Sequence, residues 1–208
     1  MNFMGVKFGI IAVDYEGHVP RDGMVKGLKS LSAQTYGDFD IFICHDGEKS
    51  TPYSDELAGV DLKVKTYFLH TSMRMNNWGH SSRDAAMRFA YANTDCEYYI
   101  HFNIDNYLFP NALEAINDKI ESTGSDVVVF SINHYKPGGI RVPTPAYFTG
   151  VPPMQYNIDA MQMVAHRDVW ARIGFWSLTY EQSDGEIYEH ICSRNRWEHI
   201  AEVLGNNY

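Results

Sequence analysis

The sequence predicts a layered α/β protein whose mostly parallel central sheet is flanked by helices, in a single domain over residues 1–208. Two continuous apolar runs rich in β-branched residues, VKFGIIAV at 6–13 and DVVVFSI at 126–132, are typical of strands covered on both faces. Segments whose apolar residues recur at helical spacing lie between such runs. Strands that alternate with helices favour a parallel sheet with helices on its faces.

The first half of the chain supplies most of the expected sheet. Strands are expected at 6–13, 40–44, 62–69 and 98–103. A helix over 23–32 follows Asp22, which is expected to be its N-cap. A second helix is expected to begin at 81–84 (SSRD), where an S-x-x-D pattern resembles a capping box.

The second half is less regular. Pro110 is expected to open a helix, and a buried strand follows at 126–132. Residues 136–153 hold five of the eight prolines and are expected to form a long loop. The remaining elements are expected to be a short strand at 158–164, helices at 167–173 and 184–194, and a final strand at 197–204.

Composition excludes several classes of protein. With 26 acidic and 17 basic residues, the formal net charge of −9 argues against a nucleic-acid partner, because that affinity depends on basic side chains at phosphates. The three cysteines, Cys44, Cys96 and Cys192, show neither zinc spacing nor a disulfide framework. No transmembrane segment and no N-terminal cleavage signal are recognised, so a cytoplasmic protein is expected.

Polar side chains follow three of the predicted strands. In an open parallel sheet, ligands bind beyond the carboxyl ends of the strands. The polar residues at these positions are Asp14 and Tyr15, then Asp46, then Asn103, Asp105 and Asn106. Several acids at one sheet edge suit a hydroxylated, metal-bound ligand, although each acid alone is also explained as a helix cap or a turn residue.

Three blocks of sequence follow one another along the chain: SLSAQTYGDFDIFICHDGEKS at 30–50, NWGHSSRD at 77–84 and YYIHFNIDNYLFPNAL at 98–113. They resemble, in the same order, the S-L-x-x-Q-T-Y…D-D-G-S, N-x-G-x-S-x-A-R-N and D-x-D-D blocks of family 2 glycosyltransferases. That family has the GT-A fold. The resemblance therefore implies a GT-A-like, Rossmann-like sheet, with a nucleotide-sugar-binding half at 1–115 and a smaller acceptor-side half at 116–208.

The resemblance also implies roles for single residues. Asp46 would accept a hydrogen bond from the nucleotide base, Arg83 would approach the diphosphate or the sugar, and Asp105 would bind Mn²⁺ or Mg²⁺. The complete set of implied nucleotide-sugar-binding residues is Ala12, Val13, Asp14, Tyr15, Asp46, Arg83, Asn103, Ile104 and Asp105.

The chain departs from the family pattern at His45, Asn103 and Asn106, where the family has or often has acids. Hard divalent cations favour charged oxygen ligands, so fewer carboxylates weaken the metal site. The metal is therefore expected to bind mainly together with the nucleotide, whose phosphate oxygens complete its coordination shell.

By the same resemblance, the segment TYEQSDGEIYEH at 179–190 carries the general base. Ser183-Asp184 resembles the E-D motif of the family, whose Asp is the base in inverting members. Asp184 is thus expected to take the proton of the acceptor hydroxyl, or else to be only the N-cap of its helix. Glu181 and Glu186 are the alternative candidates for the general base.

Weaker candidates complete the site. Trp78, Tyr147 and Trp176 are either sugar-stacking residues or core, and His199 is either a third metal ligand or a structural residue. The segments 136–153 and 176–183 are expected to shape the acceptor pocket, because loops carry specificity.

These observations predict a glycosyltransferase of the hexosyltransferase type. It would move a sugar from a nucleotide-diphosphate donor, a UDP-sugar by default, to a hydroxyl group of a glycan or another acceptor. The alternative is a non-catalytic nucleotide- or glycan-binding module, favoured by Asn103, Asn106 and the missing Glu before Asp184. A nucleotidyltransferase is disfavoured, because residues 14–23 lack a Gly-rich loop with Arg and Lys.

Overall fold

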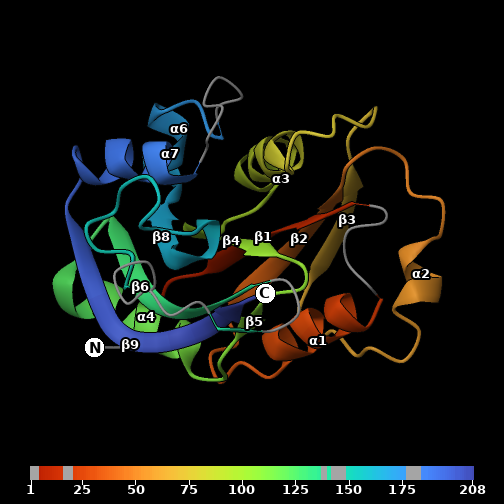
Figure 1. The fold of residues 1–208 in the computed structure, drawn as a ribbon, viewed down its shortest axis with the longest axis horizontal. Coiled ribbons are helices and arrows are strands. Elements are labelled where there is room, and N and C mark those ends of the chain that lie inside the picture. Colours follow the sequence, from red (N-terminus) through yellow and green to blue (C-terminus); the bar gives the residue numbers. More distant parts are fainter. Residues whose placement is uncertain (1–4, 16–20, 137–139, 142–148, 177–183) are drawn as a thin grey trace.

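The computed structural model describes residues 5–15, 21–136, 140–141, 149–176 and 184–208. These residues form a nine-stranded sheet with helices on both faces (Figure 1). The strands are β1 (Phe8–Asp14), β2 (Phe39–His45), β3 (Thr66–His70), β4 (Tyr98–Asn103), β5 (Tyr107–Leu108), β6 (Val127–Lys136), β7 (Ile140–Arg141), β8 (Met163–His166) and β9 (Trp197–Asn207).

The sheet is mostly parallel, as predicted. Its strands lie in the order β3-β2-β1-β4-β8-β6-β9-β5, and β7 pairs with β6. Strands β1 to β4 are parallel to one another, and β6 and β9 share their direction because β8 is antiparallel to both β4 and β6. Strands β5, β7 and β8 run the opposite way.

Helices cover each face of the sheet. They are α1 (Arg21–Ser32), α2 (Tyr53–Glu56), α3 (His80–Asn93), α4 (Ala112–Thr123), α6 (Arg167–Arg172) and α7 (Asp184–Cys192), with a 3₁₀ turn η1 (Ala160–Gln162). Helices α1 and α4 contribute to one hydrophobic cluster, and α3, α6 and α7 to the other (Figure 1). Strand β1 supplies both clusters, because side chains alternate along a strand: Ile10 faces the first and Ile11 the second.

The apolar face of α1 shows why its sequence folds as a helix. Met24, Leu28 and Leu31 recur at helical spacing and are all buried in the first cluster. Burying each such side chain contributes about 1.5–3 kcal/mol to stability. In α4, Leu113, Ile116 and Ile120 do the same for the opposite end of this cluster, as their spacing predicts.

The predicted capping box of α3 is wrong. Gly79, with a left-handed φ of 80°, is the N-cap, and it makes no side-chain cap bond. Ser81 and Asp84 lie inside the helix instead. The side chain of Asn77 supplies the missing acceptor: its Oδ1 accepts a hydrogen bond from the Ser81 backbone N–H at 3.3 Å.

The predicted strand at 158–164 is also wrong in its first half. Residues 160–162 form η1, and only the residues from Met163 onwards join β8. The reason is a true capping box: Asp159 Oδ1 accepts from the Met161 N–H at 3.0 Å, and Gln162 Oε1 accepts from the Asp159 N–H at 2.9 Å. This capping box fixes Asp159 at the N-terminus of the buried turn η1.

The order β2-β1-β4 creates the topological switch point of the sheet. Strands β1 and β4 are neighbours, with Val13 opposite Asn103, yet β1 connects through α1 to β2 on its other side. Ligands bind at such a point, beyond the carboxyl ends of the strands. The residues that follow β1 and β4 therefore meet at one edge.

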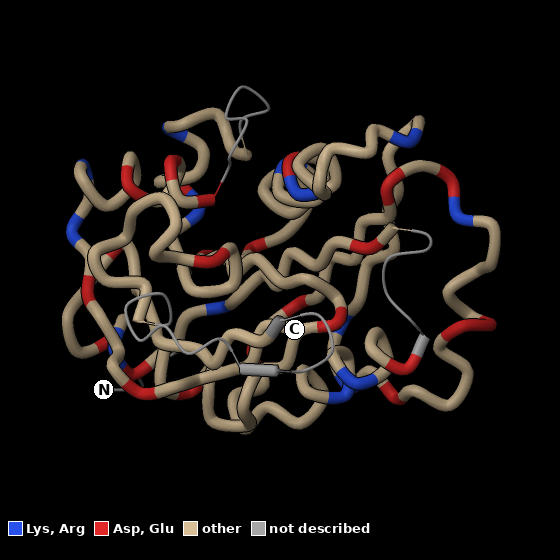
Figure 2. Tube along the Cα trace, viewed as in Figure 1, with Lys and Arg blue, Asp and Glu red and all other residues tan. Residues whose placement is uncertain are grey.

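Two further properties of the described residues bear on function. No helix among them combines the length and the apolar composition needed to cross a bilayer. Acidic positions lie on both sides of the sheet, interspersed with basic ones (Figure 2).

Candidate active site at the carboxyl ends of β1 and β4

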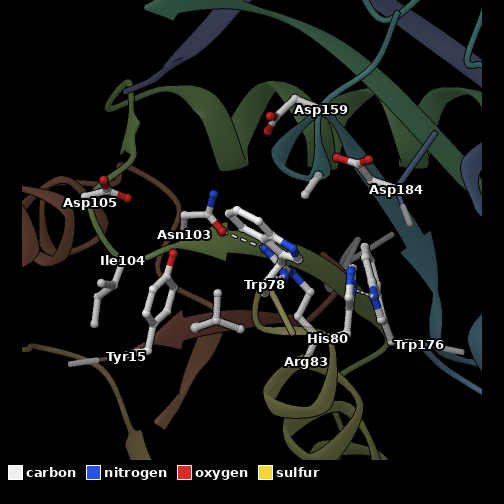
Figure 3. Close-up of a pocket in the computed structure, with 12 residues that line it drawn as sticks. Tyr15, Trp78, His80, Arg83, Asn103, Ile104, Asp105, Asp159, Trp176 and Asp184 are labelled. Carbon is white, nitrogen blue, oxygen red and sulfur yellow. Dashed lines mark hydrogen bonds between the residues drawn. The ribbon is translucent and has the colours of Figure 1, made fainter. Parts of the chain in front are cut away.

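A cavity of about 270 Å³ opens at the switch point. Asp105 lies on one side of this cavity, Asp159 and Asp184 lie on the other, and Asn103, Arg83 and Trp78 lie between them (Figure 3). The complete lining is Val13, Tyr15, Trp78, His80, Arg83, Asn103, Ile104, Asp105, Asp159, Ala160, Trp176 and Asp184. The cavity thus joins residues from β1, α3, β4, η1 and α7.

Asp105 lies in a tight turn that directly follows strand β4. A hydrogen bond from the Asn106 N–H to the Asn103 carbonyl at 2.9 Å closes this turn. Burial and the charge of Asp105 both raise the pKa of the Tyr15 phenol, which keeps this hydroxyl neutral as a hydrogen-bond donor. The Asn106 side chain is fully buried, and neither of its amide atoms has a partner.

The centre of the cavity holds a buried cation, Arg83, which is 5% exposed. Its Nη1 donates to the Trp78 carbonyl at 2.9 Å, and its Nη2 donates to Asn103 Oδ1 at 2.6 Å. The guanidinium also stacks on the Trp176 ring, 5.2 Å from its centroid. Burial lowers the pKa of Arg83, but an arginine stays protonated in proteins.

The opposite wall carries two carboxyl groups, Asp159 and Asp184. Desolvation and the neighbouring charge of Asp184 raise the pKa of Asp159 to about 7. Asp159 is held by the Met161 N–H at 3.0 Å and by the side-chain amide of Asn207. At neutral pH this pair therefore retains part of one proton, and its charge stays below that of two separate carboxylates.

Aromatic and imidazole side chains form the floor and the rim. Trp176 is buried and donates its indole N–H to His80 Nδ1 at 2.7 Å. Trp78, by contrast, is 80% exposed and has a left-handed φ of 58°. Strained backbone and exposed apolar side chains are both typical of binding sites, so we expect a ligand to cover Trp78.

A second, smaller cavity of about 140 Å³ adjoins the first and shares Tyr15 and Trp78 with it. Asp46 lines it, together with Arg74, Asn76 and Gly79. Asp46 Oδ1 accepts from the Met75 N–H at 2.9 Å, and Oδ2 accepts from the Asn76 N–H at 2.8 Å. Oδ1 also accepts from the Thr71 hydroxyl at 3.5 Å, so Asp46 fixes the loop before α3 and Oδ2 keeps a further lone pair for a ligand.

Most of the predicted site residues come together here. Val13, Tyr15, Arg83, Asn103, Ile104, Asp105 and Asp184 line the first cavity, and Asp46 lines the second. Ala12 and Asp14 line neither cavity: Ala12 lies in the core, and Asp14 accepts from the Tyr53 hydroxyl at 2.8 Å.

Other candidates lie elsewhere. His199 in β9 does not line the cavity; its Nε2 lies 3.1 Å from the Thr149 carbonyl. Glu186 lies in α7 and also does not line it. Tyr147, Glu181, Ser183 and large parts of the two predicted acceptor loops lie outside the described residues.

Asp159, Ala160 and His80 line the first cavity but were not among the residues that the sequence predicted for the site. The signal for Asp159 was present as D-x-x-Q at 159–162, a capping pattern hidden in a segment interpreted as a strand. His80 carried no signal, since its role depends on Trp176, which is 96 residues away in the chain.

The residues at Asp105 fit a divalent cation only in part. No group of three or more His, Cys, Asp or Glu side chains suited to a metal ion occurs in the described part of the chain. The Oδ1 atom of Asn103 is already taken by Arg83. Asn106 is fully buried and does not line the cavity, so Asp105 is the carboxylate that this side offers. Such a donor set suits a cation whose other oxygen ligands come from a bound nucleotide.

Comparison with known proteins agrees with this geometry. The family model described as glycosyl transferase family 2 matches residues 21–169. Hyaluronan synthase of Streptococcus pyogenes is 25% identical over 117 residues, which cover 54% of this chain and 26% of the synthase. The chain therefore spans about a quarter of the length of that curated relative.

Solved structures show the same fold at low identity. TarS 1-349 of S. aureus has a TM-score of 0.76 at 13% identity, covering 97% of this chain and 60% of that one. The same protein in complex with UDP-GlcNAc has a TM-score of 0.73 at 14% identity, covering 97% and 58%. The mannosyltransferase PcManGT of Pyrobaculum calidifontis, in complex with GDP-Man and Mn²⁺, has a TM-score of 0.70 at 12% identity, covering 97% and 56%.

Proposed function

Because this chain belongs to glycosyl transferase family 2, we propose that it transfers a sugar from a nucleoside-diphosphate donor to a hydroxyl group of an acceptor. The observation that carries the proposal is one cavity with Asp105 on one side, Arg83 in the centre, and the carboxyl groups of Asp159 and Asp184 on the other side (Figure 3). An inverting transferase needs this polarity, since its attacking hydroxyl and its leaving group lie on opposite sides of the anomeric carbon.

The donor would lie across both cavities. Its base would enter the smaller cavity beside Asp46 and Tyr15, and its diphosphate would reach Arg83 and Asp105 in the larger one. TarS is solved with UDP and with UDP-GlcNAc, and PcManGT with GDP-Man, so UDP- and GDP-sugars are the first donors to test. We propose that residues 1–115 hold the donor and residues 116–208 shape the acceptor side.

Asp105 would hold a divalent cation, Mn²⁺ or Mg²⁺, together with the phosphate oxygens of the donor. When bound, such a cation stabilises the negative charge that grows on the diphosphate leaving group. The chain itself contributes the two unused N–H groups on Nη1 and Nη2 of Arg83 and the neutral hydroxyl of Tyr15.

Asp184 would act as the general base. Its carboxylate would accept the proton of the acceptor hydroxyl while the oxygen attacks the anomeric carbon, which gives inversion. The carboxyl group of Asp159 lies beside it on the same wall (Figure 3).

Release of nucleoside diphosphate tests this function. The protein is incubated with a panel of UDP- and GDP-sugars and Mn²⁺, with and without EDTA. Slow donor hydrolysis that EDTA suppresses, and that Asp105→Ala abolishes, is the expected result. Binding of nucleotides without turnover, for any donor and acceptor, would contradict catalysis.

That second result would favour a non-catalytic nucleotide- or glycan-binding module on the same fold. The observation in its favour is Asn103, an amide at the position that matches the first acid of the family's Asp-X-Asp motif. In that case the cavity binds the nucleotide sugar, but it binds a divalent cation too weakly to stabilise the diphosphate as a leaving group.

A further inference from the structure

Arg83 is a buried cation that makes no ion pair with the described residues. In the described part of the chain no carboxylate lies within ion-pair distance of its guanidinium group, whose two hydrogen bonds go to the Trp78 carbonyl and the amide of Asn103. Its Nε is buried and has no partner. Burying a charge without an ion-pair partner is unfavourable, so a site that keeps one is built to receive an anion.

Residue 103 decides whether this charge is available. Asn103 Oδ1 accepts from Arg83 Nη2 at 2.6 Å, so a carboxylate of the same shape there would form a short ion pair with the guanidinium. Such a pair would neutralise Arg83. The asparagine keeps the same geometry but leaves the positive charge in place.

The position of Arg83 suits the diphosphate of the donor. It lies in the centre of the larger cavity, between Asp105 on one side and Asp159 and Asp184 on the other (Figure 3). The guanidinium has five N–H groups, and its two hydrogen bonds leave one N–H free on each Nη. Paired N–H groups of this kind suit phosphate oxygens.

We propose that Arg83 is a built-in cation of this site: because residue 103 is an asparagine, the guanidinium binds the diphosphate directly and holds a nucleoside diphosphate without a divalent ion. This inference rests on the proposed function. It states which group of the protein balances the negative charge of the bound diphosphate. A divalent ion is then needed for turnover, when charge grows on the leaving group, and is not needed for binding.

Binding without turnover tests this directly. The affinities of UDP and GDP are measured by calorimetry in EDTA and in Mn²⁺, for the wild type and for Asn103→Asp. We expect the wild type to lose less than about tenfold in affinity when Mn²⁺ is removed. In Asn103→Asp we expect a loss of at least about a hundredfold in EDTA, because the new carboxylate pairs with Arg83 and repels the diphosphate, and recovery in Mn²⁺ through the added metal ligand.

The chain offers a matched control in Asn195→Asp. Asn195 Oδ1 accepts from Arg172 Nη2 at 2.8 Å, so this variant places a carboxylate beside an arginine and changes the net charge equally. Asn195 does not line the cavity. Its affinity for UDP should match the wild type in both buffers.

A comparison of UDP with UMP separates the contribution of the second phosphate to affinity from that of the base. In EDTA the wild type should prefer UDP over UMP by at least about tenfold, and Asn103→Asp should lose that preference. Thermal unfolding of each variant confirms that it is folded.

The outcomes distinguish a wrong role for Arg83 from a wrong proposed function. If the wild type binds UDP or GDP only with Mn²⁺, or if Asn103→Asp binds equally well in EDTA, the role of Arg83 is wrong and the proposed function stands. If neither nucleotide binds in either buffer, the proposed function fails and this inference fails with it.

Discussion

The indole N–H of Trp176 donates to His80 Nδ1 at 2.7 Å, and the two rings stack at 20° with centroids 6.0 Å apart. Because Nδ1 is the acceptor, the proton of the neutral imidazole must lie on Nε2. The buried tryptophan therefore sets the tautomer of a histidine that lines the cavity. It also ties Trp176, which follows α6 in the chain, to the start of α3.

The first prediction concerns this pair. Burial and the charge of Arg83 lower the pKa of His80, so the imidazole should titrate below pH 6.5 in an NMR titration. Trp176→Phe should reduce the free energy of unfolding by about 1–3 kcal/mol, since it leaves a half-buried acceptor unpaired. A variant as stable as the wild type in urea would show that the bond contributes nothing.

The pair of carboxyl groups predicts a pH dependence of stability. The pKa of Asp159 is raised to about 7 in the folded protein, above its ordinary value, so the folded state binds this proton more tightly than the unfolded chain. Stability should therefore fall as the pH rises from about 4 to about 7, with each pKa unit worth about 1.4 kcal/mol.

Asp159→Asn should remove that fall and make the protein more stable than the wild type above pH 7. Urea unfolding at pH 5 and pH 8 measures both effects. Asp118→Asn, in the solvent-exposed part of α4, is the control and should leave the pH profile unchanged. Parallel profiles for Asp159→Asn and the wild type would contradict the raised pKa.

The strained backbone of Trp78 gives a third prediction. A non-glycine residue with a φ of 58° is strained by about 1–2 kcal/mol, and the exposed indole loses little burial when it is removed. Trp78→Gly should be more stable than Trp78→Ala by about 1 kcal/mol, because the two variants differ in backbone freedom and share the loss of the ring.

Both Trp78 variants should bind UDP more weakly than the wild type, by about tenfold, if the indole covers the base or the sugar. Quenching of tryptophan fluorescence on addition of UDP should also disappear. A wild-type affinity in both variants would show that the ring stays uncovered.

The fourth prediction tests the general base. Asp184→Asn should lower the rate of transfer about 10²–10⁴-fold, as expected when a positioned base is lost. The affinity for UDP should stay the same, because Asp184 lies on the wall opposite Asp105 (Figure 3). Equal losses in binding and in transfer would indicate a structural role for this residue.

The sequence by itself determined the architecture. Strand β4 was predicted with its observed bounds, α6 within one residue and the start of α4 within two, because continuous apolar runs and helical spacing are local signals. The mostly parallel, GT-A-like sheet was also predicted, through the resemblance to family 2 glycosyltransferases. Helix α2 and the two-residue strands β5 and β7 were missed, since so few residues carry no periodicity.

The tertiary structure alone decided the chemistry of the cavity. Whether Arg83 is neutralised depends on Asn103, 20 residues away, and the pKa of Asp159 depends on Asp184 and on burial between η1, β9 and α7. Electrostatic interactions act over a few ångströms in space, whatever the separation along the chain. A pattern read along the chain identifies the acids, but only their placement sets which of them carry charge.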